Sequence, residues 1–457
     1  MQTTTVVPAA RRATRTEVAD RAWIVAVVVG INALVIAGMW LRHGGIADAQ
    51  GPGAVATATG QLTGLFGAYA VLIELLLMSR IGWIERYLGL DRMAVWHRWN
   101  GFAAVWLLVA HTVFITLGYA ASNRASFLGQ TGDFIRHYPD VLMAYFALGM
   151  FIAIAATSVR LARRELRRET WHLVHLYAYL AVALGFAHQL AVGSDFVTDR
   201  AARVYWIALY VVVAAALIGW RAVRPIALNL EHRLRVESVV PEAPGVVSIH
   251  VSGRRLDRLG AQPGQFFLWR FLTKDGWYKA HPFSLSAPPT RDSMRFTVKN
   301  LGDETARMQQ VRPGTRLFAE GPYGTFTAAR RTRREVLLIA AGIGITPLRA
   351  LVEAIPARRG EVMLLYRIVH PRDAIFEDEL RELARSRGIV VHIIPGSEIG
   401  DDNTDLLSVP SLRAGVPRIA SRDCYICGPP SFVDALRRRL ERLGVPRRNI
   451  HFERFEF

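Results

Sequence analysis

The apolar residues of this chain follow two different patterns, one in each half. In the first half they form six long runs, each close to the 17–25 residues or so that an α-helix needs to cross a bilayer. These predicted spans are residues 22–41, 60–78, 101–120, 141–159, 171–192 and 204–220. The first run is too long for a signal peptide, whose apolar core has about 7–15 residues. We therefore predict a six-helix transmembrane bundle.

Arginine placement predicts which ends of the spans face the cytoplasm. Arginines gather before the first span, between the second and third, between the fourth and fifth, and after the sixth. The alternate loops, 42–59, 121–140 and 193–203, hold fewer of them. Because cytoplasmic flanks are rich in Arg and Lys, we expect a multi-pass protein of the cell (plasma) membrane. Its N-terminus and everything after the sixth span should be cytoplasmic.

After Arg224-Pro225 the apolar runs become short and alternate with polar residues, as they do in β-strands. Six such runs, bounded by Gly, Pro or Asp, predict a small antiparallel β-barrel. They are residues 233–240, 246–251, 265–271, 277–285, 294–298 and 315–319.

From residue 335 onward, strand-like runs alternate with helical stretches. The expected strands are 335–340, 361–367, 390–394 and 423–427, and the expected helices are 347–354, 374–387 and 430–443. This alternation predicts an α/β domain built on a parallel sheet.

Charge and cysteine content exclude some functions. The net charge is +18, but no compact basic module with interleaved aromatic residues is present, so we expect no nucleic-acid partner. The chain has 2 cysteines, Cys424 and Cys427, too few for a disulfide scaffold in a chain this size. They lie in a strand-like run whose alternation should point them to opposite faces, so we do not expect a redox dithiol.

Four histidines lie at or within the third and fifth spans, where ionisable residues are costly and usually functional. They are His97, His111, His175 and His188. A spacing of 14 residues separates two helical side chains by about 21 Å, which suits two haems, one near each leaflet. Paired imidazoles leave no open site on iron, which suits electron transfer. Two alternatives remain open: a membrane-anchored flavin reductase lacking haem, in which the histidines serve packing, and a proton or ion pathway.

The spacings also test this hypothesis. A separation of 14 residues leaves two side chains about 40° apart around a helix, whereas 13 residues leave them about 140° apart. His175 and His188 have the second spacing. We therefore predict a local distortion of the fifth span near Gly185.

Three short segments in the expected barrel have features of a flavin site. His281, Pro282, Phe283 and Ser284 end an aromatic strand, and the Ser284 hydroxyl can hydrogen-bond the flavin N5. The segment that contains Lys299, Gly302 and Thr305 offers a turn and a helix start whose N–H groups can bind a pyrophosphate. A tight turn at residues 320–324 follows. Their order before a nucleotide-type domain predicts FAD binding.

The α/β part has features of a nicotinamide dinucleotide site. Gly342, Gly344, Thr346 and Pro347 follow a buried strand and open a helix, which lets backbone approach a phosphate. Cys427, Gly428 and Pro429 end another strand at the edge where ligands bind. Arg367 or Arg372 could meet a 2′-phosphate, which favours NADPH over NADH. The terminal Phe457 could stack on the flavin and move aside for nicotinamide.

Together these residues resemble the NADPH oxidase and ferric reductase superfamily. The histidine spacings match its two-haem pattern, His281–Ser284 its flavin motif, Gly342–Pro347 its nucleotide loop, Cys427-Gly-Pro its nicotinamide motif and Phe457 its terminal aromatic residue. The resemblance implies that His97 and His175 bind an inner haem, and that His111 and His188 bind an outer one. It also implies catalytic roles for Ser284, Cys427 and Phe457.

The expected organisation has four parts. They are a cytoplasmic arm (1–20), a haem-binding membrane domain (21–224), an FAD-binding β-barrel domain (225–330) and an NAD(P)-binding α/β domain (331–457). Electrons are expected to pass from cytoplasmic NADPH or NADH through FAD and two b-type haems to an extracytoplasmic small-molecule acceptor. Oxygen, giving superoxide, and a ferric chelate are both compatible with the sequence. Oligomeric state, regulation and protein partners stay open.

Overall fold

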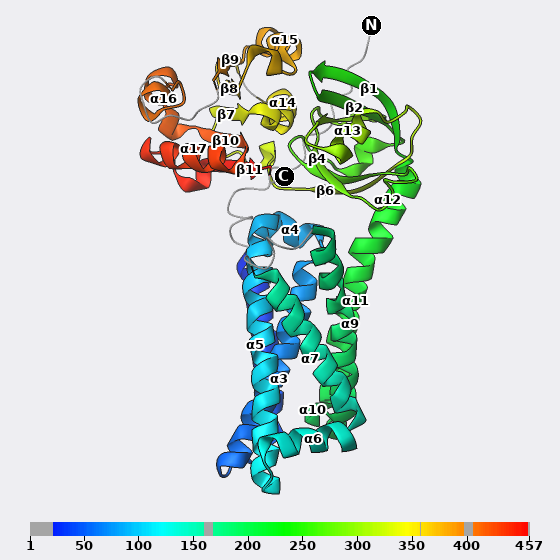
Figure 1. The fold of residues 1–457 in the computed structure, drawn as a ribbon. Coiled ribbons are helices and arrows are strands. Elements are labelled where there is room, and N and C mark those ends of the chain that lie inside the picture. The colour runs from blue at the N-terminus through cyan, green and yellow to red at the C-terminus, as the bar shows by residue number, and fades with distance from the viewer. Residues whose placement is uncertain (1–21, 160–167, 357, 397–404, 456–457) are drawn as a thin grey trace. The chain divides into compact units, whose positions relative to one another are not determined.

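The computed structural model describes residues 22–159, 168–356, 358–396 and 405–455. The chain divides into two compact units, one of which spans Ala19–Ala222 while the other includes Val223–Phe457. Each unit is described by itself below (Figure 1).

The first unit contains the predicted spans. Six of its helices are long and apolar enough to cross a membrane. The six candidate spans start within the helices α2 (Ala22–Arg42), α3 (Pro52–Leu77), α5 (Leu90–Asn123), α7 (Pro139–Ser158), α9 (Arg168–Val192) and α11 (Arg200–Ile218). Figure 1 shows them running alongside one another. Large apolar side chains such as Trp99 and Trp106 are exposed on this unit, as expected for a lipid-facing surface. The expectation of a multi-pass membrane protein is confirmed at this level.

Shorter helices fill three of the connections. They are α4 (Gly82–Leu88), α6 (Phe127–His137) and α10 (Ser194–Thr198). Ser126 caps α6 by accepting a hydrogen bond from the Gly129 N–H, and Asp199 caps α11 in the same way through Ala201. The apolar runs of the sequence do not predict these connecting helices, because each is too short for a span.

Helix α3 packs closely against α5 through a row of glycines. A Cβ at Gly60 would lie 2.7 Å from Ile115, and one at Gly67 would lie 2.9 Å from Leu108. Small residues spaced three or four apart allow two membrane helices to approach at this distance. The close approach places the α3 backbone within reach of the α5 histidines.

Helix α9 is α-helical throughout Arg168–Val192, so no interruption of the helix accompanies the distortion predicted near Gly185. A π-helical turn occurs instead at Gly219–Val223, before α12 (Arg224–His232). The prediction assumed that His175 and His188 must lie on the same face of α9. In the structure His175 lies beside His97, and His188 lies nearer to His111, further along the helices.

The second unit begins with six antiparallel strands in two three-stranded sheets. One sheet has the order β1 (Arg235–Ala243), β2 (Val246–Ser252), β5 (Ser293–Lys299), and the other β4 (His281–Ser284), β3 (Phe266–Phe271), β6 (Leu317–Tyr323). In β3 every second side chain is buried, and Phe267 and Trp269 share one core with Ile249 and Phe296 of the other sheet. Isolated bridges pair Leu285 with Phe296 and Arg235 with Arg316.

A five-stranded parallel sheet follows, in the order β11-β10-β7-β8-β9. Its strands are β7 (Val336–Ala341), β8 (Val362–Ile368), β9 (Val390–Pro395), β10 (Asp423–Gly428) and β11 (Ile450–Arg454). Helices α14 (Ile345–Ala354) and α15 (Glu377–Arg387) contribute to the core on one face. Helices α16 (Val409–Gly415) and α17 (Pro430–Arg442) contribute to the core on the other. The predicted α/β parallel sheet is therefore confirmed.

Candidate functional site

The four histidines form two pairs across α5 and α9. The rings of His97 and His175 face each other with centroids 5.9 Å apart and planes inclined by 67°. Trp171, one turn before His175, stacks on its ring at 5.1 Å. Further along the same helices, His188 lies within electrostatic range of His111. The helices thus bring His97 near His175, and His111 near His188.

Helix α3 holds the ring of His111 in place. Its Nδ1 donates a hydrogen bond of 2.7 Å to the carbonyl oxygen of Gly60. A Cβ at Gly64 would lie only 2.5 Å from the same Nδ1, so the ring occupies space that this glycine leaves open. With Nδ1 engaged, Nε2 is the nitrogen left to bind a metal, and such an outer hydrogen bond is typical of metal-ligating histidines.

The four histidines have the chemistry to serve as ligands of haem iron. The Nδ1 of His188 is buried within the bundle. An imidazole of this kind is a common axial ligand of haem iron. The described residues contain no cluster of three or more metal-ligating side chains.

Sequence reasoning missed two polar residues beside His97. The Glu74 carboxylate forms an ion pair with Nδ1 of His97 through Oε2. The Asn100 side-chain amide donates to Oε1 of Glu74 at 2.5 Å and to the Ala70 carbonyl at 2.9 Å. Glu74 is the one charged residue in the α3 sequence, and an isolated charge inside a span is the signal that could have identified it.

The flavin segment lies on strand β4, where its residues are well ordered by aromatic packing. Phe283 stacks on Phe296 with planes inclined by 9° and centroids 5.4 Å apart, and its carbonyl accepts from the Trp269 indole. The buried hydroxyl of Ser284 has no hydrogen-bond partner among the described residues. That hydroxyl fits the predicted hydrogen bond to a flavin.

The expected pyrophosphate segment lies near the start of this strand. Gly302 precedes helix α13 (Asp303–Gln309), and the Thr305 hydroxyl accepts from the Leu301 N–H at 2.8 Å. Lys279, just before β4, donates to Glu304 of α13 at 2.5 Å. This hydrogen bond raises the pKa of Lys279 and lowers that of Glu304. Lys299 is exposed at the end of β5. These two of the three predicted flavin segments are therefore neighbours.

The nucleotide loop and the Cys-Gly-Pro motif meet at the carboxyl end of the parallel sheet. Gly342 has a left-handed φ of +53°, which glycine adopts without strain. A Cβ at Gly344 would overlap the Cys427 carbonyl, so the loop can lie against β10 only because this residue is glycine. Thr346 and Pro347 are buried at the start of α14, and Pro429 precedes α17. The predicted dinucleotide segments are thus brought together.

Both thiols are buried on opposite faces of β10, as the alternation predicted. Cys424 packs in one core of the parallel sheet, and Cys427 packs in the other. Burial raises the pKa of Cys424 to about 12 and raises the pKa of Cys427 well above its ordinary value. Neither thiol is disposed to react as a thiolate.

The predicted arginines lie at or just beyond the end of β8. Arg367, at the end of β8, is engaged by the buried carboxylate of Asp405 at 3.2 Å. Arg372 is exposed just beyond the same strand. Phe457 lies outside the described residues, but the Phe455 N–H donates to the Gly428 carbonyl at 3.3 Å. The chain therefore runs past the Cys-Gly-Pro motif as it approaches its end.

An ion-pair network between the antiparallel sheets and the parallel-sheet part was also missed. Arg295 of β5 contacts both carboxylate oxygens of Glu379 of α15, at 2.6 and 2.9 Å. Arg349 of α14 lies 2.6 Å from the same carboxylate. Burial raises the pKa of Glu379, but the two arginines outweigh it and the net shift is downward. The backbone oxygen of Ser286, two residues after Ser284, accepts from Arg295 at 3.0 Å.

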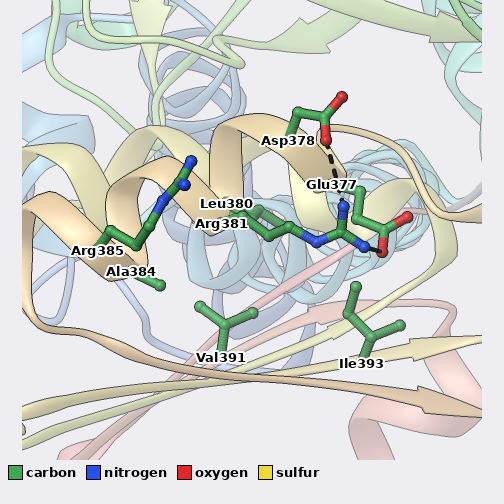
Figure 2. A pocket seen from close by; sticks show the side chains of 8 residues that line it. All are labelled: Glu377, Asp378, Leu380, Arg381, Ala384, Arg385, Val391 and Ile393. Carbon is green, nitrogen blue, oxygen red and sulfur yellow. Dashed lines mark hydrogen bonds and ion pairs between the residues drawn. The ribbon is translucent and has the colours of Figure 1, made fainter.

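A groove of about 690 Å³ lies apart from these residues, between α15 and the edge strand β9. Figure 2 shows Arg381 reaching Glu377 and Asp378 at its rim, above Val391 and Ile393. None of the predicted cofactor residues lines this groove.

Comparison with known families agrees with both halves of the site. Residues 63–186 match the family described as ferric reductase like transmembrane component, and residues 338–438 match the oxidoreductase NAD-binding domain. The first of these ranges contains His97, His111 and His175, and it ends two residues before His188. The second contains the nucleotide loop and Cys427-Gly-Pro.

Individual relatives match part of the chain. The ferredoxin reductase component of a 3-ketosteroid-9-alpha-monooxygenase from Mycolicibacterium smegmatis is 34% identical, over 44% of this chain and 57% of that protein. A flavohemoprotein from Pseudomonas aeruginosa is 32% identical, over 54% of this chain and 62% of that protein. The FAD/NAD-binding domain of a Vibrio cholerae nitric oxide dioxygenase has 22% identity and a TM-score of 0.40, over 49% of this chain and 99% of that one. The chain spans a little over half the length of the first of these relatives.

These matches and the geometry agree on the organisation of the protein. The chain thus contains a region that matches a ferric reductase like transmembrane component, followed by a region that matches an oxidoreductase NAD-binding domain.

Proposed function

We propose that the chain carries electrons from cytoplasmic NAD(P)H, through FAD and two b-type haems, to a small-molecule acceptor on the other side of the cell membrane. The pairing of the α5 histidines with the α9 histidines carries this proposal. His97 and His175 would hold the inner haem, and His111 and His188 the outer one. When bound, FAD accepts two electrons as hydride and releases them singly, and each haem iron carries one.

The chain's own residues would bind and orient the cofactors. The Gly342–Pro347 loop, lying against Cys427 and Gly428, would hold the nicotinamide dinucleotide at a helix start. Ser284 would hydrogen-bond the flavin from β4, and the segment around Gly302 would hold its pyrophosphate. Phe457 would cover the flavin ring and move aside for nicotinamide. Exposed Arg372 would contact the 2′-phosphate of NADPH, because Arg367 is engaged by Asp405.

The proposed barrel and orientation have separate support. The isolated bridges Leu285–Phe296 and Arg235–Arg316 link the two antiparallel sheets at both sides, as a closed six-stranded barrel requires. With six spans, both ends of the chain face the same side, and the arginine-rich flanks favour the cytoplasm. His111 and His188 then lie toward the outer side, near the segment 121–140, where the acceptor would bind.

The test uses full-length protein reconstituted in sealed vesicles with its dehydrogenase part facing outward. NADH or NADPH is added outside, and a trapped Fe(III) chelate or superoxide probe reports inside. We expect reduction of the trapped acceptor, faster with NADPH. A flavin reductase lacking haem would reduce only acceptors added outside, and its reduced-minus-oxidised spectrum would show no α-band.

A further inference from the structure

Helix α3 presents two different groups to the two histidines of α5. Gly60 offers a backbone carbonyl to His111, and Glu74 offers a carboxylate to His97. Gly60 and Glu74 are 14 residues apart, the same spacing that separates His97 from His111. Because both helices rise by the same distance per residue, this matched spacing keeps both contacts in register.

The Glu74 carboxylate is held from several sides. Its side chain is only 13% exposed within the unit, and Oε1 accepts from Asn100, which is itself fixed to the Ala70 carbonyl. A Cβ at Gly101 would lie 3.3 Å from Oε2, so glycine leaves room for the carboxylate beside His97. A charged group in a membrane span is costly, and this one is placed against a proposed haem ligand.

We propose that Glu74 is a positioning residue that fixes the ring of His97 and lowers the reduction potential of the inner haem relative to the outer one. The inference rests on the proposed function, because it needs haem between the histidines. A carboxylate accepting the Nδ1–H of a ligating histidine increases the electron donation of that ring and stabilises the more oxidised metal. A neutral carbonyl, as at His111, does so less.

This difference would give electron flow a direction. Electrons pass spontaneously from a site of lower potential to one of higher potential. With the charged partner at the inner histidine and the neutral partner at the outer one, transfer toward the outer side is favoured. The two contacts of α3 would therefore give the inner and outer haems different reduction potentials along this path.

Optical redox titration of the full-length protein, purified from haem-supplied cells, tests this role. Glu74→Gln keeps a hydrogen-bond acceptor but removes the charge, and Glu74→Leu removes both. Glu85→Gln, at another buried carboxylate of the same unit, is the matched control. The outer haem serves as a reference within each sample.

In Glu74→Gln we expect both haems to remain and the ferric–ferrous equilibrium of one to shift toward ferrous about tenfold, which is about 59 mV for one electron. Glu74→Leu should lose most of one haem, while Glu85→Gln should match wild type. Two retained haems with unshifted potentials in both Glu74 variants, or equal shifts of both haems, would overturn the inference alone. Wild-type protein without haem would overturn the proposed function as well.

Discussion

The Nδ1 of His111 donates a 2.7 Å hydrogen bond to the carbonyl oxygen of Gly60 on the neighbouring helix α3. The contact is made where glycines bring the two helices close together, and it fixes which ring nitrogen faces away from α3. The proposed haem site thus involves three helices: α5 and α9 supply the histidines, and α3 contacts two of them.

Gly64→Ala should displace the His111 ring, because the added Cβ would lie 2.5 Å from Nδ1. Overpacking of this kind costs about 1–3 kcal/mol, and the ring can relieve it by rotating away. We expect about half of the haem to be lost, measured by pyridine haemochrome against protein concentration. Gly30→Ala is the control, since nothing lies within 4 Å of a Cβ there. Full haem content in Gly64→Ala would contradict the packing argument.

Histidine substitutions should act in pairs. His111→Leu and His188→Leu should each remove the same haem, so the double variant should lose no more than either single variant. Combining His111→Leu with His97→Leu should remove both haems. Redox titration distinguishes the haem that remains in each case. If His111→Leu and His188→Leu together cost twice as much haem as either alone, the pairing across α5 and α9 is wrong.

Ser284→Ala should slow reduction of the flavin without releasing it. The hydroxyl is buried and has no hydrogen-bond partner among the described residues, so a bound flavin would be its partner. One hydrogen bond contributes about 0.5–1.5 kcal/mol, which corresponds to a decrease of about two- to tenfold. Stopped-flow reduction by NADPH measures the rate, with Ser293→Ala of β5 as control. An unchanged rate would remove Ser284 from the site.

Acid should weaken the contact between β5 and α15. The folded pKa of Glu379 lies below its ordinary value of 4.5, so its stabilisation is complete above pH 4.5 and is lost as the pH falls through the folded pKa. Glu379→Gln should therefore be less stable than wild type near neutral pH, by up to about 1 kcal/mol, and the difference should vanish in acid. Thermal release of flavin, followed by fluorescence across pH, measures this. A difference that grows in acid would contradict the sign.

The two thiols should be unreactive in the folded protein. Burial raises the pKa of Cys424 to about 12 and that of Cys427 well above its ordinary value, so almost no thiolate is present near neutral pH. We expect no maleimide modification of native protein and modification of both residues after denaturation, by mass spectrometry. Rapid labelling of Cys427 in the native protein would show that the motif opens.

The regular patterns of the chain predicted most of the fold. Each predicted span corresponds to a helix that is apolar enough to cross a membrane, because uninterrupted apolar runs of this length are typical of membrane-spanning helices. Strand ends were less predictable: the run 277–285 became β4 at His281–Ser284, since turns after Gly276 shorten it. The sequence alone does not decide whether β11 forms, because only its pairing with β10 distinguishes it from a tail.

The candidate site was predictable where a motif is local. The nucleotide loop and Cys427-Gly-Pro were found separately, but only the structure shows that Gly344 lets them touch. Glu74 and Gly60 were missed, because their contacts with the histidines depend on the register of α3 against α5. Helix α9 is not interrupted at Gly185, where a distortion was predicted; that prediction used helical angles within α9 alone, which do not say how its partners approach.

Haem content of the wild-type protein tests the central claim most directly. Full-length protein, expressed with added haem precursor and purified in detergent, is titrated with dithionite and then with NADPH under nitrogen. We predict a Soret band, an α-band on reduction, and two haems per chain that EPR identifies as low-spin with two histidine ligands. A protein that carries FAD and oxidises NADPH but shows no Soret absorbance would contradict the account.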